Sequence, residues 1–343
     1  MNDALVPFFD GHNDTLLLLH ERAAGAGAFL GGTGGHLDLP LARSGGLAAG
    51  FFAVFIPNDP AQPPAAAGEL PAALEPGYAQ RVTHAMIATL HRIERAASGA
   101  VRVVRTSDDL AAARDAGALA AVLHLEGADA IDESLDALEV YHQAGVRSLG
   151  IVWSRPNGFG SGVPFRFPHD PDIGPGLSDA GKALVRACNE LGIVIDLSHL
   201  NAAGFRDVAA HSRAPLVATH SNVHAICPSP RNLTAWQLDA IRDSGGMVGV
   251  NLHVGFLRPD GLRTSDTPLD VVVDHFVALV ERLGIGHVGL GSDFDGALMP
   301  AGLADAGRLQ HLAQALRRRG FDEADVRRLA YDNWRDLLAR TWR

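Results

Sequence analysis

The stretch Phe8–Asp14 reads FFDGHND and closes an apolar run with a histidine and an aspartate. Alternate residues of a strand point to the same side, so the run predicts a strand that directs His12 and Asp14 into one space and Asn13 away from it. An imidazole and a carboxylate on one face form either a hydrogen-bonded structural pair or half of a metal site. The rest of the chain has to decide between these two interpretations.

Seven further apolar runs follow, separated by stretches with helical periodicity, and a ninth run predicts an extra short strand. The seven span 46–57, 118–129, 145–154, 191–200, 214–222, 245–253 and 287–296, and the extra run spans 101–106. Helices are predicted at 78–97, 178–192, 234–246 and 268–284. Ser178 is the N-cap candidate of the second helix, which ends at Gly192, a typical stop.

Strand and helix alternating eight times predict an α/β fold, a closed (β/α)8 TIM-type barrel with long active-site loops. An open doubly wound sheet is the alternative, but the first strand is not followed by G-x-G-x-x-G. The Pro/Ala-rich segment 57–71 and the Gly/Pro-rich segment 154–178 are the long loops, and loops of this length are usually functional or disordered. Without a repeat or a linker, residues 1–343 are predicted to form a single metal-dependent hydrolase barrel domain.

Composition narrows the class of protein. A formal net charge of −10 argues against nucleic acid as a partner. The two cysteines, Cys188 and Cys227, form no CxxC pattern, so neither a disulfide framework nor a thiolate zinc site is predicted. The apolar run at 16–19 is too short for a signal peptide or a membrane span. We therefore expect a soluble cytoplasmic protein that does not bind membranes.

Polar side chains end five of the eight predicted strands, and in a barrel of this class such ends meet at the active-site face. They are His12, Asp14, Glu126, His199, His220, Asp293 and Asp295. Taken singly, each has an ordinary explanation: a strand-end histidine is usually hydrogen-bonded, and Asp295 suits the turn before Gly296. Together they give nitrogen and oxygen ligands without thiolate, a set that suits Zn²⁺, Mn²⁺, Fe or Co. The six without Asp295 exceed what one catalytic zinc uses, which favours two metals bridged by a carboxylate.

The motifs DGHND, HLEG, DLSH, THSN, PRNL and GSDFDG, in this order, resemble the membrane dipeptidase (renal dipeptidase) family of zinc metallopeptidases, in the amidohydrolase superfamily. The resemblance covers the chain from Asp10 to about Gly296 and includes HLDLPLARSGGLAAGFFAVFIP near the second strand. Any one of these motifs would be weak evidence, whereas the ordered set is specific.

The resemblance implies a role for each motif residue. His12 and Asp14 would bind one zinc, His199 and His220 would bind the other, and Glu126 would bridge the two with a hydroxide between them. Asp293 would complete the first metal's sphere and shuttle the proton. Arg231, with Asn232 beside it, would face the substrate's carboxylate, which a guanidinium fork matches; from the sequence alone, Arg231 reads equally well as a solvated loop residue.

The sequence departs from the family pattern at one position. Where the family has a substrate-contacting histidine at the end of the fourth strand, this chain has Trp153. If strand geometry continues, Arg155 points the same way and is the better donor for the developing oxyanion, while Trp153 narrows the pocket. The alternative is that Arg155 begins a loop and is solvated.

The expected reaction is hydrolysis of a dipeptide amide bond by a hydroxide bridging two Zn²⁺ per chain. A small-molecule substrate of this kind is the expected partner, and a homodimer is compatible with the sequence. One alternative is an amidohydrolase acting on a lactam, a lactone or an N-acyl amino acid, because a fold does not determine the substrate. The other is a barrel that binds a metal or ligand without turnover.

Overall fold

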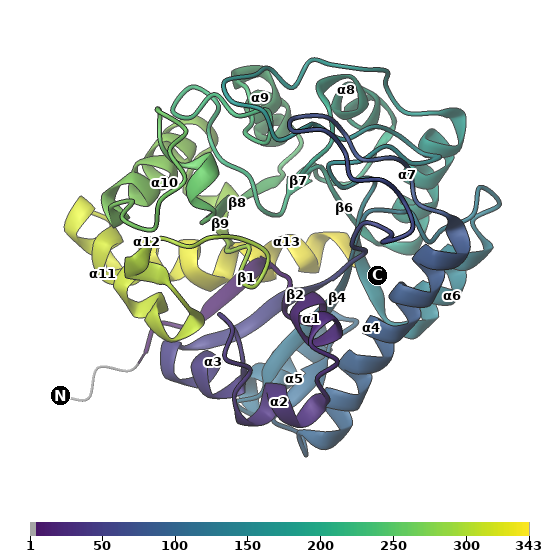
Figure 1. Ribbon diagram of the computed structural model, residues 1–343. Helices are drawn as coiled ribbons and strands as arrows, with labels where there is room; N and C mark the ends of the chain where they lie inside the picture. The colour runs from purple at the N-terminus through teal and green to yellow at the C-terminus, as the bar shows by residue number, and fades with distance from the viewer. Residues whose placement is uncertain (1–4, 343) are drawn as a thin grey trace.

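The computed structural model describes residues 5–342 and is built around a nine-stranded parallel sheet, eight strands of which close into a barrel (Figure 1). The strands are β1 (Phe8–Asn13), β2 (Leu47–Phe55), β3 (Val101–Val103), β4 (Leu119–Glu126), β5 (Val146–Gly150), β6 (Val194–Asp196), β7 (Val217–Ala218), β8 (Met247–Asn251) and β9 (Val288–Gly291). This confirms the predicted (β/α)8 barrel, and each of the nine predicted runs contains one strand.

The barrel closes through the pairing of β2 with β4, which runs in unbroken register from Ala49↔Ala120 to Phe55↔Glu126. The other neighbours follow the order β2-β1-β9-β8-β7-β6-β5-β4. Strand β3 pairs with the first residues of β4, and β5 pairs with its later residues. The run at 101–106 therefore supplies the extra short strand that the sequence predicted, outside the barrel proper.

Helices surround the barrel and confirm the four predicted ones. They are α1 (Thr15–Glu21), α2 (Ala26–Gly31), α3 (Leu39–Gly45), α4 (Pro76–Ala96), α5 (Ser107–Asp115), α6 (Asp136–Ala144), α7 (Asp179–Leu191), α8 (Ala202–His211), α9 (Ala235–Asp243), α10 (Leu269–Leu283), α11 (Leu309–Arg319), α12 (Glu323–Arg327) and α13 (Asn333–Thr341). Ser178 caps α7 as predicted, because its hydroxyl accepts a hydrogen bond from the backbone N–H of Gly181. Gly192 then ends α7 with a φ of 69°.

The C-terminal helix α13 packs against the side of the barrel where the strands begin (Figure 1). Its Trp334 is fully buried, and its ring centroid lies 5.2 Å from that of Phe51. The indole N–H donates to the carbonyl of Leu290 at 2.9 Å. A Cβ at Gly11 would lie 2.5 Å from both this indole and the carbonyl of Thr219. The glycine between Asp10 and His12 is thus required by packing inside the barrel.

Two long irregular segments, 57–71 and 154–178, follow β2 and β5 as expected. They touch one another, since the Arg166 side chain donates to the carbonyl of Gly68. Among the helices of residues 5–342, none has both the length and the apolar character needed to cross a membrane.

Candidate metal centre

The side chains predicted to bind metal all lie where barrel strands end, at one mouth of the barrel. They come from β1 and β4 and from the residues that follow β1, β6, β7 and β9: His12, Glu126, Asp14, His199, His220 and Asp293. The backbone φ angles of His199 and Asp293 are 69° and 65°. Non-glycine residues rarely adopt this left-handed region, and those that do cluster at functional sites. The structure brings the six together, while their binding of metal stays a prediction.

Glu126 lies between two groups of these side chains and directs one oxygen to each. Its Oε2 is 3.5 Å from the Nε2 of His12. Its Oε1 is 3.1 Å from the Nε2 of His199 and 3.7 Å from the Nε2 of His220. Glu126 thus directs its two oxygens at different imidazoles, and its predicted bridging of two metals stays a prediction.

The first group consists of His12, Asp14 and Asp293. The Nε2 of His12 is 3.5 Å from Oδ2 of Asp14, and one ligand atom from each of the three residues lies within 4.8 Å of the others. The Asn251 amide donates to Oδ2 of Asp293 at 3.0 Å and so fixes that carboxylate. Burial, reinforced by the charge of Glu126, raises the pKa of Asp14 to about 6. Carboxylates this crowded and this buried call for a compensating cation.

The second group consists of His199 and His220, whose Nε2 atoms are 3.1 Å apart. Their Nδ1 atoms face hydroxyl groups, Ser154 Oγ at 2.8 Å and Thr219 Oγ1 at 2.9 Å. Burial lowers the pKa of both histidines well below the ordinary value. Two neutral imidazoles that point their Nε2 atoms at one carboxylate oxygen suit metal binding, because neutral imidazole is the form that coordinates.

Buried polar atoms without a hydrogen-bond partner also support the binding of a cation by these residues. Within the described part of the chain, both ring nitrogens of His12 and Oδ1 of Asp14 are buried without a hydrogen-bond partner. Buried polar atoms are normally paired, and a cation at this position would be a partner for Nε2 of His12 and Oδ1 of Asp14. Nitrogen and oxygen donors without thiolate suit zinc and similar divalent ions. The residues around Glu126 therefore fit divalent cations.

A cavity of about 140 Å³ opens onto this centre. Apart from the candidate ligands, its lining is Leu17, Phe55, Trp153, Phe165, His253, Phe256, Gly296 and Ala297. The Trp153 ring centroid lies 4.9 Å from that of Phe55, 5.5 Å from that of Phe165 and 5.8 Å from that of His199. Trp153 thus forms a wall of the cavity next to a candidate ligand, and its effect on the substrate stays a prediction.

The strand geometry expected for residues 153–155 is wrong, because β5 already ends at Gly150. The segment after Gly150 turns, and the N–H of Arg155 donates to the carbonyl of Trp153 at 2.7 Å. Alternation along a strand therefore gives no reason for Trp153 and Arg155 to share a face. Of these two residues, Trp153 lines the cavity and Arg155 does not.

Arg155 is 1% exposed, so it is not the solvated loop residue considered as the alternative. Its guanidinium donates to Oδ1 of Asp129 at 3.1 Å, to Oδ1 of Asn58 at 3.0 Å and to the carbonyl of Ile56 at 2.9 Å. These bonds join the segments that follow β2, β4 and β5. The guanidinium also lies 5.4 Å from the Trp153 ring centroid, which it supports. The role of Arg155 at the oxyanion stays a prediction. The bonds that the guanidinium already makes within the protein argue against this role.

Arg231 is 3% exposed and lies beside the second group. Its Nη2 donates to the carbonyl of His220 at 3.1 Å, and its Nε has no partner among the described residues. Burial lowers its pKa to about 10, which leaves the guanidinium charged at neutral pH. The Asn232 amide instead donates to the carbonyls of Cys227 and Phe256, both at 2.9 Å, and so holds the backbone around Arg231. Substrate binding by Arg231 and Asn232 stays a prediction.

Two polar residues near the site escaped the sequence analysis. Asn251, the last residue of β8, orients Asp293, and the nearby His253 lines the cavity. Both stand in VNLH at the end of an apolar run, so the strand-end rule that identified the other residues could have found them. Asp295, by contrast, is used structurally: its carboxylate accepts hydrogen bonds from the Thr15 hydroxyl and the His36 N–H.

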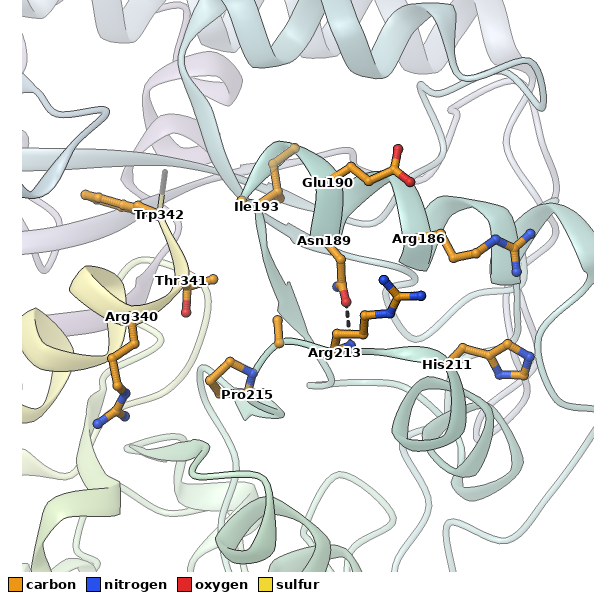
Figure 2. A pocket seen from close by; sticks show the side chains of 12 residues that line it. Arg186, Asn189, Glu190, Ile193, His211, Arg213, Pro215, Arg340, Thr341 and Trp342 are labelled. Carbon is orange, nitrogen blue, oxygen red and sulfur yellow. Dashed lines mark hydrogen bonds between the residues drawn. The ribbon is translucent and has the colours of Figure 1, made fainter.

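A second cavity, of about 230 Å³, lies at the opposite end of the barrel, beside the residues that precede β6 and β7 (Figure 2). Its lining includes Arg186, His211, Arg213 and Arg340, and Asn189 fixes the backbone N–H of Arg213. Catalytic groups of (β/α)8 barrels come from the other end of the strands. The smaller cavity at the carboxyl ends of the strands is therefore the candidate active site.

A family model and a relative of known sequence both match most of this chain. The model of the membrane dipeptidase family (peptidase family M19) matches residues 4–340. An uncharacterized protein in the pqqA 5′ region of Klebsiella pneumoniae is 45% identical over 267 residues, which cover 78% of this chain and 98% of that protein.

Two solved structures are similar over almost the whole chain. One is a metallopeptidase from Rhodobacter sphaeroides liganded with a phosphinate mimic of the dipeptide L-Ala-D-Ala, with 49% identity, a TM-score of 0.95 and coverage of 99% of this chain and 100% of that chain. The other is the dipeptidase AC, a metallopeptidase of family M19, with 50% identity, a TM-score of 0.94 and coverage of 99% of each chain.

Proposed function

The chain belongs to the membrane dipeptidase family, peptidase family M19, and we propose that it hydrolyses the amide bond of dipeptides with two zinc ions held at the barrel mouth. The observation that carries the proposal is Glu126, whose two oxygens lie 3.5 Å from His12 Nε2 and 3.1 Å from His199 Nε2. His12, Asp14 and Asp293 would hold one ion, and His199 and His220 the other. The Rhodobacter sphaeroides relative, which binds a dipeptide mimic, supports a substrate of this size.

Bound metal would polarise the scissile carbonyl and lower the pKa of the attacking water toward neutrality. The protein supplies the remaining steps. Asp293 takes the proton of the attacking water and delivers it to the leaving amine, with its Oδ2 held by Asn251. Trp153, Phe165 and Phe256 line the cavity and exclude water from around a short substrate.

A substrate panel tests the proposed reaction. Dipeptides with L and D residues at the second position are compared with N-acyl amino acids, lactams and lactones, all at equal zinc saturation. Dipeptides should give the highest kcat/KM, and a chelator should abolish the activity. A higher kcat/KM for any of the other classes would replace the dipeptidase assignment with that of another amidohydrolase.

We expect Arg231→Lys to weaken recognition of the substrate's free carboxylate. The Arg231 Nε has no partner among residues 5–342, and hydrogen bonds to charged groups contribute about 1.5–3 kcal/mol. The variant should therefore lose roughly 10- to 100-fold in kcat/KM on a dipeptide, but much less on the corresponding dipeptide amide. Arg258→Lys, which alters an ion pair with Asp260 away from the cavity, is the control. Equal losses on acid and amide would show that Arg231 does not read the carboxylate.

A further inference from the structure

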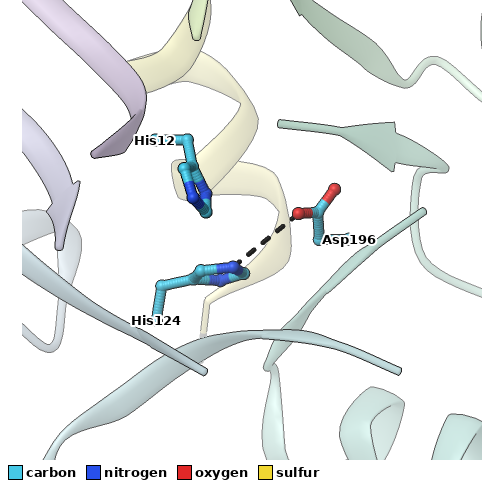
Figure 3. Close-up of side chains that lie close together, drawn as sticks. All are labelled: His12, His124 and Asp196. Carbon is cyan, nitrogen blue, oxygen red and sulfur yellow. Dashed lines mark ion pairs between the residues drawn. The ribbon is translucent and has the colours of Figure 1, made fainter. Parts of the chain in front are cut away.

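A buried polar group lies beneath the candidate ligands, around Asp196 at the end of β6 (Figure 3). The carboxylate is 1% exposed. Its Oδ1 accepts hydrogen bonds from the backbone N–H of Ser198 at 2.9 Å and of Thr219 at 2.8 Å. Its Oδ2 accepts a bond from the Thr219 hydroxyl at 2.6 Å. Asp196 therefore fixes both the backbone and the side chain of the residue that precedes His220.

The direction of these bonds determines where the protons are. A threonine hydroxyl has one proton to donate, whereas an ionised carboxylate only accepts. The Thr219 hydroxyl donates to Asp196, so its oxygen accepts the Nδ1–H of His220 at 2.9 Å. The Nε2 of His220 then carries no proton, and its lone pair faces Oε1 of Glu126 at 3.7 Å. This is the tautomer that a metal ligand requires.

A histidine that is not among the predicted ligands also lies close to Asp196. The closest imidazole is His124, whose Nε2 is 3.7 Å from Oδ2 of Asp196 (Figure 3). The Nδ1 of His124 is paired with the Ser148 hydroxyl at 2.9 Å. Asp196 therefore reaches the imidazole of His220 through the Thr219 hydroxyl, and His124 is held separately by Ser148.

We propose that Asp196 and Thr219 are positioning residues that fix His220 in its metal-binding tautomer, with the threonine hydroxyl inserted between carboxylate and imidazole. The inference rests on the proposed function, because it assigns a role toward the metal. Carboxylates that act on a ligand histidine in this way orient the ring and raise its basicity, and their removal typically costs 10- to 100-fold in metal affinity or activity. The Nδ1 of His199 faces the Ser154 hydroxyl, whereas the Nδ1 of His220 faces a hydroxyl that donates to a carboxylate, so the two histidines differ in their support.

The test compares Thr219→Val, which keeps the shape but removes the hydroxyl, with Thr219→Ser, which keeps the hydroxyl. Thr83→Val, at a buried position of α4, controls for the same substitution elsewhere. Zinc affinity is measured by competition with a chromogenic chelator, and the Co²⁺-substituted proteins are compared by visible absorption. We expect Thr219→Val to lower the affinity for one of the zinc equivalents by roughly 10- to 100-fold and to alter the visible spectrum of the Co²⁺-substituted protein. Thr219→Ser and Thr83→Val should match the wild type.

Wild-type affinity in Thr219→Val would overturn the positioning role, as would an equal loss in Thr219→Ser, which would assign the effect to packing of the methyl group. A wild type that binds no zinc would overturn the proposed function and the positioning role with it. His12, His124 and Asp196 also hold ligand atoms within 4.8 Å of one another. A third wild-type zinc equivalent that is lost in His124→Asn would make Asp196 a metal ligand and overturn its role toward Thr219.

Discussion

Replacing Asp293 by asparagine should lower kcat on the best dipeptide by a factor on the order of 10² to 10⁴ while most of the metal stays bound. The amide keeps the size of the side chain but cannot accept the proton of the attacking water. The other candidate ligands near Asp293, His12 and Asp14, are unchanged and continue to hold the metal. Single-turnover kinetics at saturating zinc, with elemental analysis of the same sample, separates loss of proton transfer from loss of metal.

Asp295→Asn is the matched control, two residues further along the same turn. Its carboxylate is committed to Thr15 and to the backbone of His36, so this change should alter stability and leave kcat near the wild-type value. If Asp293→Asn kept substantial activity, the proton would have to move through another group. A collapse of activity in Asp295→Asn alone would reassign the role to that residue.

Replacing Glu126 by glutamine should affect both metal binding and activity, because Glu126 faces both candidate metal positions. A neutral amide presents one oxygen and one nitrogen where the carboxylate presents two anionic oxygens. We expect loss of at least one zinc equivalent and a drop in activity of more than about 100-fold. Removing a residue that only supports a metal ligand already costs up to about 100-fold in metal affinity or activity. The measurement is zinc content together with kcat/KM across a range of added zinc.

Glu133→Gln, on an exposed segment after β4, is the control for the same chemical change. It should behave as wild type in both zinc content and activity. Retention of two zinc equivalents by Glu126→Gln would contradict the bridging role, whatever happened to the rate. Full recovery of activity at high zinc would instead identify a defect of affinity alone.

The barrel and most of its mouth could be predicted from sequence, because buried parallel strands read as apolar runs and the residues that end them stand out as polar. His12, Glu126 and His220 each follow such a run directly. Asn251 and His253 carry the same signal but stand outside the motifs that carried the resemblance. The site therefore contains more polar residues at the ends of apolar runs than the motifs alone identify.

Other features depend on contacts that no local pattern records. Strand β5 ends at Gly150, so the alternation assumed for Trp153 and Arg155 does not apply, and the guanidinium binds Asp129 across the structure. The positive φ of His199 turns that imidazole toward the site after β6 has ended. Trp334 fills the barrel from more than 300 residues downstream of Gly11, which its indole approaches. Contacts between residues that are far apart in the sequence determine this local geometry, and they produce no periodic pattern in the sequence.

The most direct test of the two-metal account is a zinc titration of chelator-treated, metal-free protein. Dipeptide hydrolysis and bound zinc are measured after each addition, the latter by elemental analysis of the desalted protein. The account predicts no hydrolysis without metal and a rise in activity that is complete only at two equivalents per chain. Full activity at one equivalent, or hydrolysis by the metal-free protein, would contradict it.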